Sequence, residues 1–225
     1  TLDAIDYSDD RYSFWGIGGE LGPRYVSGKS EYGAGLSYRQ QWNDEHRYSR
    51  TQGIFGEVSA DLSNRFALYM RASVDKVNYN DSIYQDYNAD NYGAYIRSIY
   101  IVSPRSYAVL SAALIYEDSQ TDWNTNIRQR YGLGYGIELP WGFNIYAEPS
   151  ITFANYQHER LFIGGNYMLE EIKRSDTTYG VYVSLSNKHL RFWDITPTLN
   201  FIYNRRVSNV NNYGYSRTRW EIGLS

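Results

Sequence analysis

Three histidines are the first candidates for chemistry in this sequence, because an imidazole can act as a general base or as a metal ligand. They are His46, His158 and His189. None of them stands in the HExxH spacing of a zinc site, and no serine stands in a GxSxG nucleophile motif. The chain has no cysteine, so thiolate chemistry and disulfides are excluded. We interpret the histidines as solvated residues of loops and turns, and we expect no enzyme activity, metal site or cofactor.

Carboxylates and glycines supply the remaining motifs. Acidic residues gather in segments that are predicted to be loops or strand ends: Asp81, Asp86, Asp90, Glu117 and Asp118. A membrane protease would need such carboxylates beside a histidine at a barrel rim, and a phospholipase would need a serine with a histidine base. The glycine runs GIGGELG and YGLGYG alternate along predicted strands with no helix after them, so they cannot form a phosphate-binding turn. A rim protease or lipase is the less favoured alternative.

The elements that must position these residues are strands with one apolar and one polar face. About eleven segments of roughly 9 to 14 residues show period-two alternation, which is the length and pattern of strands that cross a bilayer at a tilt. The alternation is sharpest where Leu68, Met70 and Ala72 alternate with Tyr69 and Arg71. The segments lie near residues 15–21, 32–39, 54–62, 66–75, 92–102, 107–117, 128–139, 143–153, 178–186, 195–204 and 219–224.

Composition agrees with a single all-β domain covering residues 1–225. The 25 tyrosines, 6 tryptophans and 19 glycines beside 5 prolines are typical of strands, tight turns and interfacial aromatic belts. No apolar run approaches the roughly 18 residues of a membrane-spanning helix, so a helical membrane protein is excluded. The net charge of -3 and the scattered cations exclude nucleic acid as a partner.

Connections of two lengths alternate along the chain. Short connections are predicted at Ser27–Lys29, Ser63–Arg65, Pro104–Ser106, Pro140–Gly142 and Asn187–Trp193. Longer ones are predicted at Asn43–Arg50, Asn78–Asn91, Asp118–Asn126, Gln157–Asp176 and Val207–Arg217. Short periplasmic turns and longer extracellular loops are the pattern of a transmembrane antiparallel up-and-down β-barrel of the Gram-negative outer membrane, which is the predicted fold. A soluble sandwich or lipocalin-like barrel is the alternative.

This alternation also orients the chain. If the turn at Ser27–Lys29 is periplasmic, residues 1–12 lie on the cell surface and the C-terminus is periplasmic. Single-chain bacterial barrels have an even number of strands. We therefore expect at least one upstream strand to be missing from this sequence, and we favour three. Without them the barrel would expose an open edge to lipid.

Charged residues on the predicted polar faces are the candidates for lining a lumen, where they could set the selectivity of passage. An alternative is that they only form a satisfied polar lining. They are Arg39, Arg71, Arg128, Arg130, Glu138, Glu148, Arg206, Arg219 and Glu221.

The C-terminal half carries a family resemblance. The stretches ELPWGFNIYAEPSITFANY, LFIGGNY and SLSNKHLRFWDITPTLNFIYNRRVSNVNNYGYSRTRWEIGLS resemble the barrel domain of the surface lipoprotein assembly modifier family, the type XI secretion translocons. RYGLGYG and SPRS agree more weakly. The resemblance implies a fourteen-strand barrel that follows a periplasmic tetratricopeptide-type domain, and we expect that domain to be missing from this sequence.

The resemblance also implies a function and partners. Such a translocon would deliver lipoproteins or secreted haemophore-like proteins to the cell surface. Its partners would be outer-membrane lipid and lipopolysaccharide, the cargo protein, and the barrel assembly machinery for insertion. Gln157–Asp176 would gate the exit, and Ser216–Ser225 would lie at the seam between first and last strands. A passive porin-like channel is the alternative function.

Overall fold

The computed structural model describes residues 2–5, 14–43, 46–163, 169–190 and 196–224. These ranges form one antiparallel sheet with three short 3₁₀ turns. The strands are β1 (Leu2–Ile5), β2 (Phe14–Leu21), β3 (Arg24–Ser27), β4 (Ser30–Asn43), β5 (His46–Ser63), β6 (Phe66–Tyr79), β7 (Ala89–Ser103), β8 (Ser106–Ser119), β9 (Asn126–Glu138), β10 (Phe143–Ile163), β11 (Leu169–Asn187), β12 (Pro197–Ser208) and β13 (Tyr215–Leu224). The turns are η2 (Ser82–Tyr87), η3 (Asp122–Asn124) and η4 (Pro140–Gly142). No helix in the described ranges is long and apolar enough to cross a bilayer.

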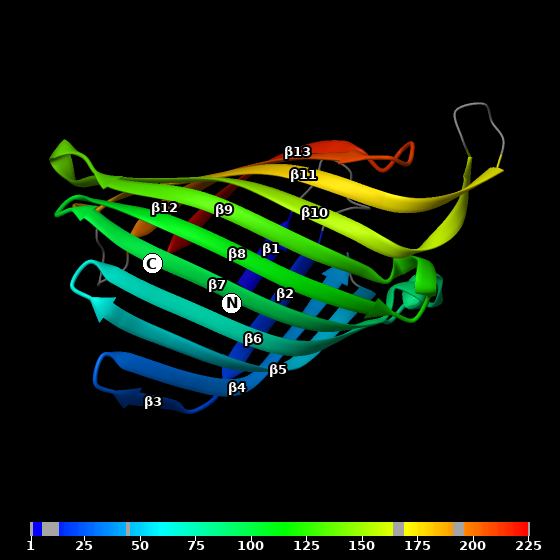
Figure 1. Cartoon of the computed structure of the whole chain (residues 1–225), viewed down its shortest axis with the longest axis horizontal. Helices are drawn as coiled ribbons and strands as arrows, with labels where there is room; N and C mark the ends of the chain where they lie inside the picture. Colours follow the sequence, from blue (N-terminus) through cyan, green and yellow to red (C-terminus); the bar gives the residue numbers. More distant parts are fainter. Residues whose placement is uncertain (1, 6–13, 44–45, 164–168, 191–195, 225) are drawn as a thin grey trace.

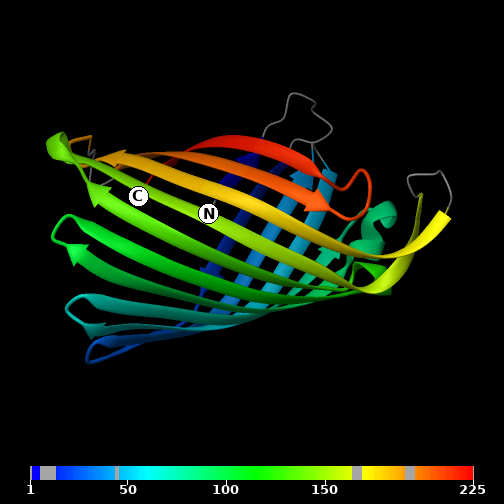
Figure 2. The same ribbon diagram turned by 45° about the horizontal axis from the view of Figure 1, so that its top comes forward.

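Each strand pairs with its neighbours in the chain, so the topology is up-and-down. The sheet curls, and β2 and β4 pass behind β7 and β8 at an angle (Figure 1), around the interior seen in Figure 2. Among the described residues β1 pairs only with β2, and β13 pairs only with β12. The sheet therefore forms a curved wall with two edges.

Strand β3 continues β2 rather than adding a separate span. Both pair with β4 in one register, in which Leu21 faces Leu36 and Arg24 faces Gly33. Pro23 stands in the interruption between them, where its missing N–H removes one ladder bond. The hairpin closes at Gly28, whose φ of 59° is a conformation that favours glycine.

The sheet is apolar on its outer face and polar on its inner face, which is the reverse of a soluble protein. Leu36 is 63% exposed and Leu133 is 62% exposed. The side chain of Glu57 on the opposite face is only 12% exposed. Among the described residues, the buried hydrophobic side chains are those of Ala89, Val109 and Val210. Lipid rather than protein must cover the outer face, which confirms the predicted class of outer-membrane β-barrel.

Each of the eleven predicted segments coincides with a strand, from β2 and β4 through β13. The count itself is corrected, because Leu2–Ile5 forms the additional strand β1 paired with β2. The prediction that residues 1–12 lie on the cell surface did not include this strand. Four residues are too few to show a period, so alternation could not reveal this strand. Further upstream strands and a periplasmic repeat domain stay predictions.

Two of the predicted long connections are mostly strand. Trp42 pairs with Arg47 and Asn43 pairs with His46, so the described part of the segment predicted as the loop Asn43–Arg50 is strand. Strands β10 and β11 have 21 and 19 residues and include most of Gln157–Asp176. Hydrogen-bonded ladders continue past the apolar band, where polar side chains give no alternating signal. The other long connections, at residues 80–88, 120–125 and 209–214, are confirmed.

Candidate lumen and its polar clusters

The residues predicted to line a lumen lie on several strands and belong to separate clusters. Arg128 contacts Glu117 at 2.5 Å, and Arg219 contacts Glu221 at 2.7 Å. Arg39 lines a cavity of about 690 Å³ together with Arg71. Glu138, at the last position of β9, accepts a hydrogen bond from Lys188 Nζ beside the short turn η4. The remaining four, Arg71, Arg130, Glu148 and Arg206, belong to the clusters described next.

Arg71 links three strands on the inner face, β2, β5 and β6. Its guanidinium donates to the Glu20 carboxylate at 2.6 and 3.0 Å and to Glu57 at 3.4 Å, and lies 4.1 Å from the centre of the Phe55 ring. Tyr69 donates to the same Glu57 at 2.7 Å. Glu20 and Glu57 were absent from the predicted set, although both stand on the polar face of an alternating segment. Only the curvature of the sheet brings Glu20 to a strand 51 residues away.

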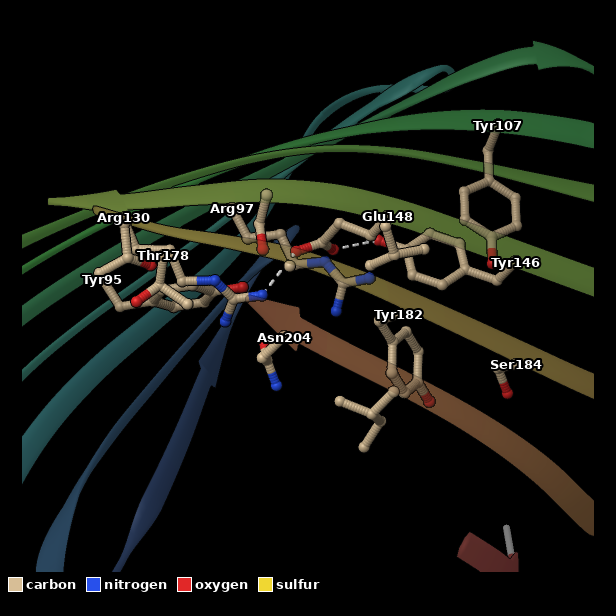
Figure 3. Close-up of a pocket in the computed structure, with 15 residues that line it drawn as sticks. Tyr95, Arg97, Tyr107, Arg130, Tyr146, Glu148, Thr178, Tyr182, Ser184 and Asn204 are labelled. Carbon is tan, nitrogen blue, oxygen red and sulfur yellow. Dashed lines mark hydrogen bonds and ion pairs between the residues drawn. The ribbon is translucent and has the colours of Figure 1, made fainter. Parts of the chain in front are cut away.

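A cavity of about 700 Å³ opens on the inner face of β7 to β12 (Figure 3). Glu148 is its only carboxylate among the described lining residues. That carboxylate accepts hydrogen bonds from Arg130 at 3.1 Å, from Ser111 at 3.3 Å and from the Tyr146 hydroxyl. The structure therefore brings the predicted residues Arg130 and Glu148 together in one polar site.

The glycines of the YGLGYG run, Gly132, Gly134 and Gly136, form a glycine floor: a strip of backbone without side chains, against which two tyrosine rings pack. Tyr107 and Tyr146 have ring centres 6.0 Å apart and nearly parallel planes. A Cβ atom at Gly134 would lie 2.3 Å from the Tyr146 oxygen, and one at Gly136 would lie 2.2 Å from Tyr107 Cζ. The glycines are thus required for close ring approach, and their alternation along β9 places them all on the inner face.

Arg97, on β7, also lines this cavity and was missed by the sequence analysis. Its guanidinium carbon lies 5.9 Å from the centre of the Tyr146 ring. Its Nε is buried and has no hydrogen-bond partner. Arg97 lies between Ile96 and Ser98, so the period of the strand could have placed it on the inner face. It was missed because apolar and polar residues alternate irregularly in this segment.

A third ionic cluster lies at the base of the β10–β11 extension, in which residues 159–163 of β10 pair with residues 169–173 of β11 beyond the ends of β9 and β12. Asp176 is 2% exposed and contacts Arg174 at 2.5 Å and Arg206 at 3.8 Å. The Arg174 guanidinium lies 4.5 Å from the Tyr156 ring centre and 3.8 Å from that of Tyr213. These contacts fix the base of the β10–β11 extension to β12 and the connection after it.

The histidines do not form a site in the described structure. His158 lies in β10 and is exposed, and His46 begins β5, so the assignment of both to loops was wrong. The side chain of His46 lies outside the described residues. His189 is near the short turn η4, where its ring approaches Gly142. No group of three or more histidine or carboxylate side chains in the described ranges is arranged to hold a metal ion.

Two solved structures that align with most of this chain are an autotransporter β-domain and a porin. The β-domain of the Bordetella autotransporter BrkA aligns with a TM-score of 0.51 and 12% identity over 88% of this chain and 86% of that domain. The KdgM porin in complex with disordered oligogalacturonate aligns with a TM-score of 0.47 and 16% identity over 94% of this chain and 89% of the porin. At 12% identity, the likeness to the BrkA domain concerns the fold alone.

Sequence comparison identifies the family. The chain is similar to the surface lipoprotein assembly modifier of Pasteurella multocida (strain Pm70), with 23% identity over 186 residues. It is also similar to surface lipoprotein assembly modifier 1 of Haemophilus influenzae (strain ATCC 51907 / DSM 11121 / KW20 / Rd), with 21% identity over 183 residues. The matches cover 80% and 81% of this chain but 36% of each relative, so the chain spans about a third of their length. Residues 3–225 match the family described as surface lipoprotein assembly modifier. The chain therefore belongs to the surface lipoprotein assembly modifier family.

Proposed function

We propose that this chain is the barrel part of an outer-membrane translocon that delivers lipoproteins or secreted haemophore-like proteins to the cell surface. The observation that carries the proposal is the family match over residues 3–225. The apolar outer face and polar inner face of the sheet support a membrane-embedded route rather than a soluble carrier. No bond is made or broken in this mechanism.

The orientation follows from connection length. The end with the turns at Gly28, Asn64 and Pro104 faces the periplasm, and the end with η2, η3 and the β10–β11 extension faces outward. Leu224 ends β13 on the periplasmic side. Insertion depends on the barrel assembly machinery, and outer-membrane lipid and lipopolysaccharide surround the apolar face.

The β10–β11 extension is the element that holds or gates emerging cargo in this proposal. From the pair Glu159 and Lys173 onward, β10 and β11 pair only with each other among the described strands, because β9 pairs no further than Tyr156 and β12 no further than Asp176. The Arg174 and Asp176 cluster holds that base in place. The lumen-lining arginines and glutamates act on passage through their charge.

Deleting the gene and staining intact cells for a surface lipoprotein tests the function. The translocon proposal expects cargo retained inside the cell, while total cargo and other surface proteins stay normal. Steady ion conductance in planar bilayers together with normal cargo display would instead identify a passive channel. Turnover that is lost in His46→Ala or His158→Ala would identify a rim enzyme.

A second experiment tests the extension itself. In the full-length protein, residues 161–171 are replaced by Asn-Gly, which joins the paired residues Arg160 and Ile172 through a two-residue turn and leaves the ionic cluster in place. We expect normal amounts of folded barrel and reduced surface cargo. Normal cargo display by this variant would exclude a gating role for the extension.

A further inference from the structure

We propose that the cavity lined by β7 to β12 binds an oxyanion, a carboxylate or a phosphate group, on the guanidinium of Arg97. This site is independent of the cargo proposal, because it rests on charges within the cavity wall. It involves a residue outside the predicted lumen set.

Among the described residues, Arg97 differs from six other arginines of the inner face in having no counter-ion. Arg71, Arg128, Arg130, Arg174, Arg206 and Arg219 each contact a carboxylate within 4 Å. In the described part of the chain, Arg97 has neither an ion pair nor a hydrogen bond, and its Nε is buried. A partly buried guanidinium without an acceptor is unfavourable, and an anion that supplies the acceptor relieves this cost.

The cavity has an excess of positive charge where Arg97 points. Its charged lining residues are Arg97, Arg130 and Glu148, and the single carboxylate already accepts hydrogen bonds from Arg130, Ser111 and Tyr146. Figure 3 shows Arg97 and Arg130 extending into the same space, with Asn204 beside them. One unit of positive charge is therefore left for a ligand.

The chemistry of the wall favours a planar or tetrahedral oxyanion. A guanidinium presents a fork of N–H donors that matches two oxygens of a carboxylate or phosphate. The Tyr146 ring, whose centre lies 5.9 Å from the guanidinium carbon of Arg97, limits the positions that this group can take. At about 700 Å³ the cavity also accommodates a larger group that bears the oxyanion.

Isothermal titration calorimetry of the purified protein in detergent micelles tests the site. Sodium phosphate and sodium acetate are titrated in separate experiments at low ionic strength, which distinguishes a phosphate from a carboxylate ligand. Arg97→Gln removes the cation, and Arg97→Lys keeps the charge but removes the fork. Arg205→Gln is the matched control, because Arg205 is an exposed residue on β12 with the same charge.

We expect at least one of the two anions to bind, with affinity about tenfold to a hundredfold lower in Arg97→Gln and unchanged in Arg205→Gln. Folding of each variant is verified by the heat-dependent shift of a barrel in gel electrophoresis. If Arg97→Gln fails to fold, a clear loss of affinity in Arg97→Lys supports the site. The proposal is overturned if neither anion binds the wild type, if the Arg97 variants bind as tightly as the wild type, or if Arg205→Gln weakens binding equally.

Discussion

Substituting Gly134 by alanine tests whether the glycine floor of β9 positions the tyrosine rings. The added Cβ would lie 2.3 Å from the Tyr146 oxygen and 2.7 Å from its Cζ, while carbon atoms in contact are normally about 3.5 to 4.0 Å apart. The ring must therefore move by roughly 1 Å or more. This displacement also disturbs the hydrogen bond from Tyr146 to Glu148.

The expected loss of stability combines two effects. Overpacking costs about 1 to 3 kcal/mol, and a weakened hydrogen bond to a charged group costs about 1.5 to 3 kcal/mol when it is lost completely. We expect Gly134→Ala to lower the free energy of unfolding by about 2 to 4 kcal/mol. Gly56→Ala is the control, because a Cβ there meets nothing within 4 Å. That variant should be neutral or more stable by up to about 1 kcal/mol, since alanine restricts the unfolded chain.

Urea unfolding in lipid vesicles, followed by tryptophan fluorescence, measures both variants. Adding Tyr146→Ala to Gly134→Ala should remove most of the steric penalty, so that the two substitutions are strongly non-additive. Equal unfolding midpoints for Gly134→Ala and Gly56→Ala would refute the reasoning. So would strict additivity of Gly134→Ala and Tyr146→Ala.

Three further predictions concern the other clusters and the outer face. Arg71→Gln leaves Glu20 and Glu57 without their shared cation and should lower unfolding stability by about 1.5 to 3 kcal/mol, whereas the exposed Arg205→Gln should have little effect in the same urea titration. Asp176→Asn removes the carboxylate between Arg174 and Arg206 and should speed proteolytic cleavage of the β10–β11 extension, with no change of cleavage rate if the cluster is unimportant. Leu133→Arg places a cation on the apolar face and should cost about 2 to 4 kcal/mol in vesicles, while Ser150→Arg on the cavity side should cost less; equal costs would contradict the assigned faces.

The strands and their two faces could be predicted from the sequence because their signal is local. Leu68, Met70 and Ala72 alternate with Tyr69 and Arg71 because successive side chains of a strand point to opposite faces, and one face is apolar while the other is polar. The turn positions at Gly28 and Pro104 are likewise local, and the sequence family identified the barrel. Strand ends were not predictable where polar ladders continue beyond the apolar band, as at Trp42 and Arg47.

The grouping of the inner side chains was decided only by the tertiary structure. Sequence placed Arg130 and Glu148 on polar faces, but register and curvature determine that they meet, that Glu20 reaches Arg71, and that Arg97 meets no carboxylate. Contacts between distant strands depend on how the sheet curls, and no local period encodes this. The YGLGYG run is a further example. Its glycines make room for the Tyr107 and Tyr146 rings of neighbouring strands, and this packing role is visible only in the tertiary structure.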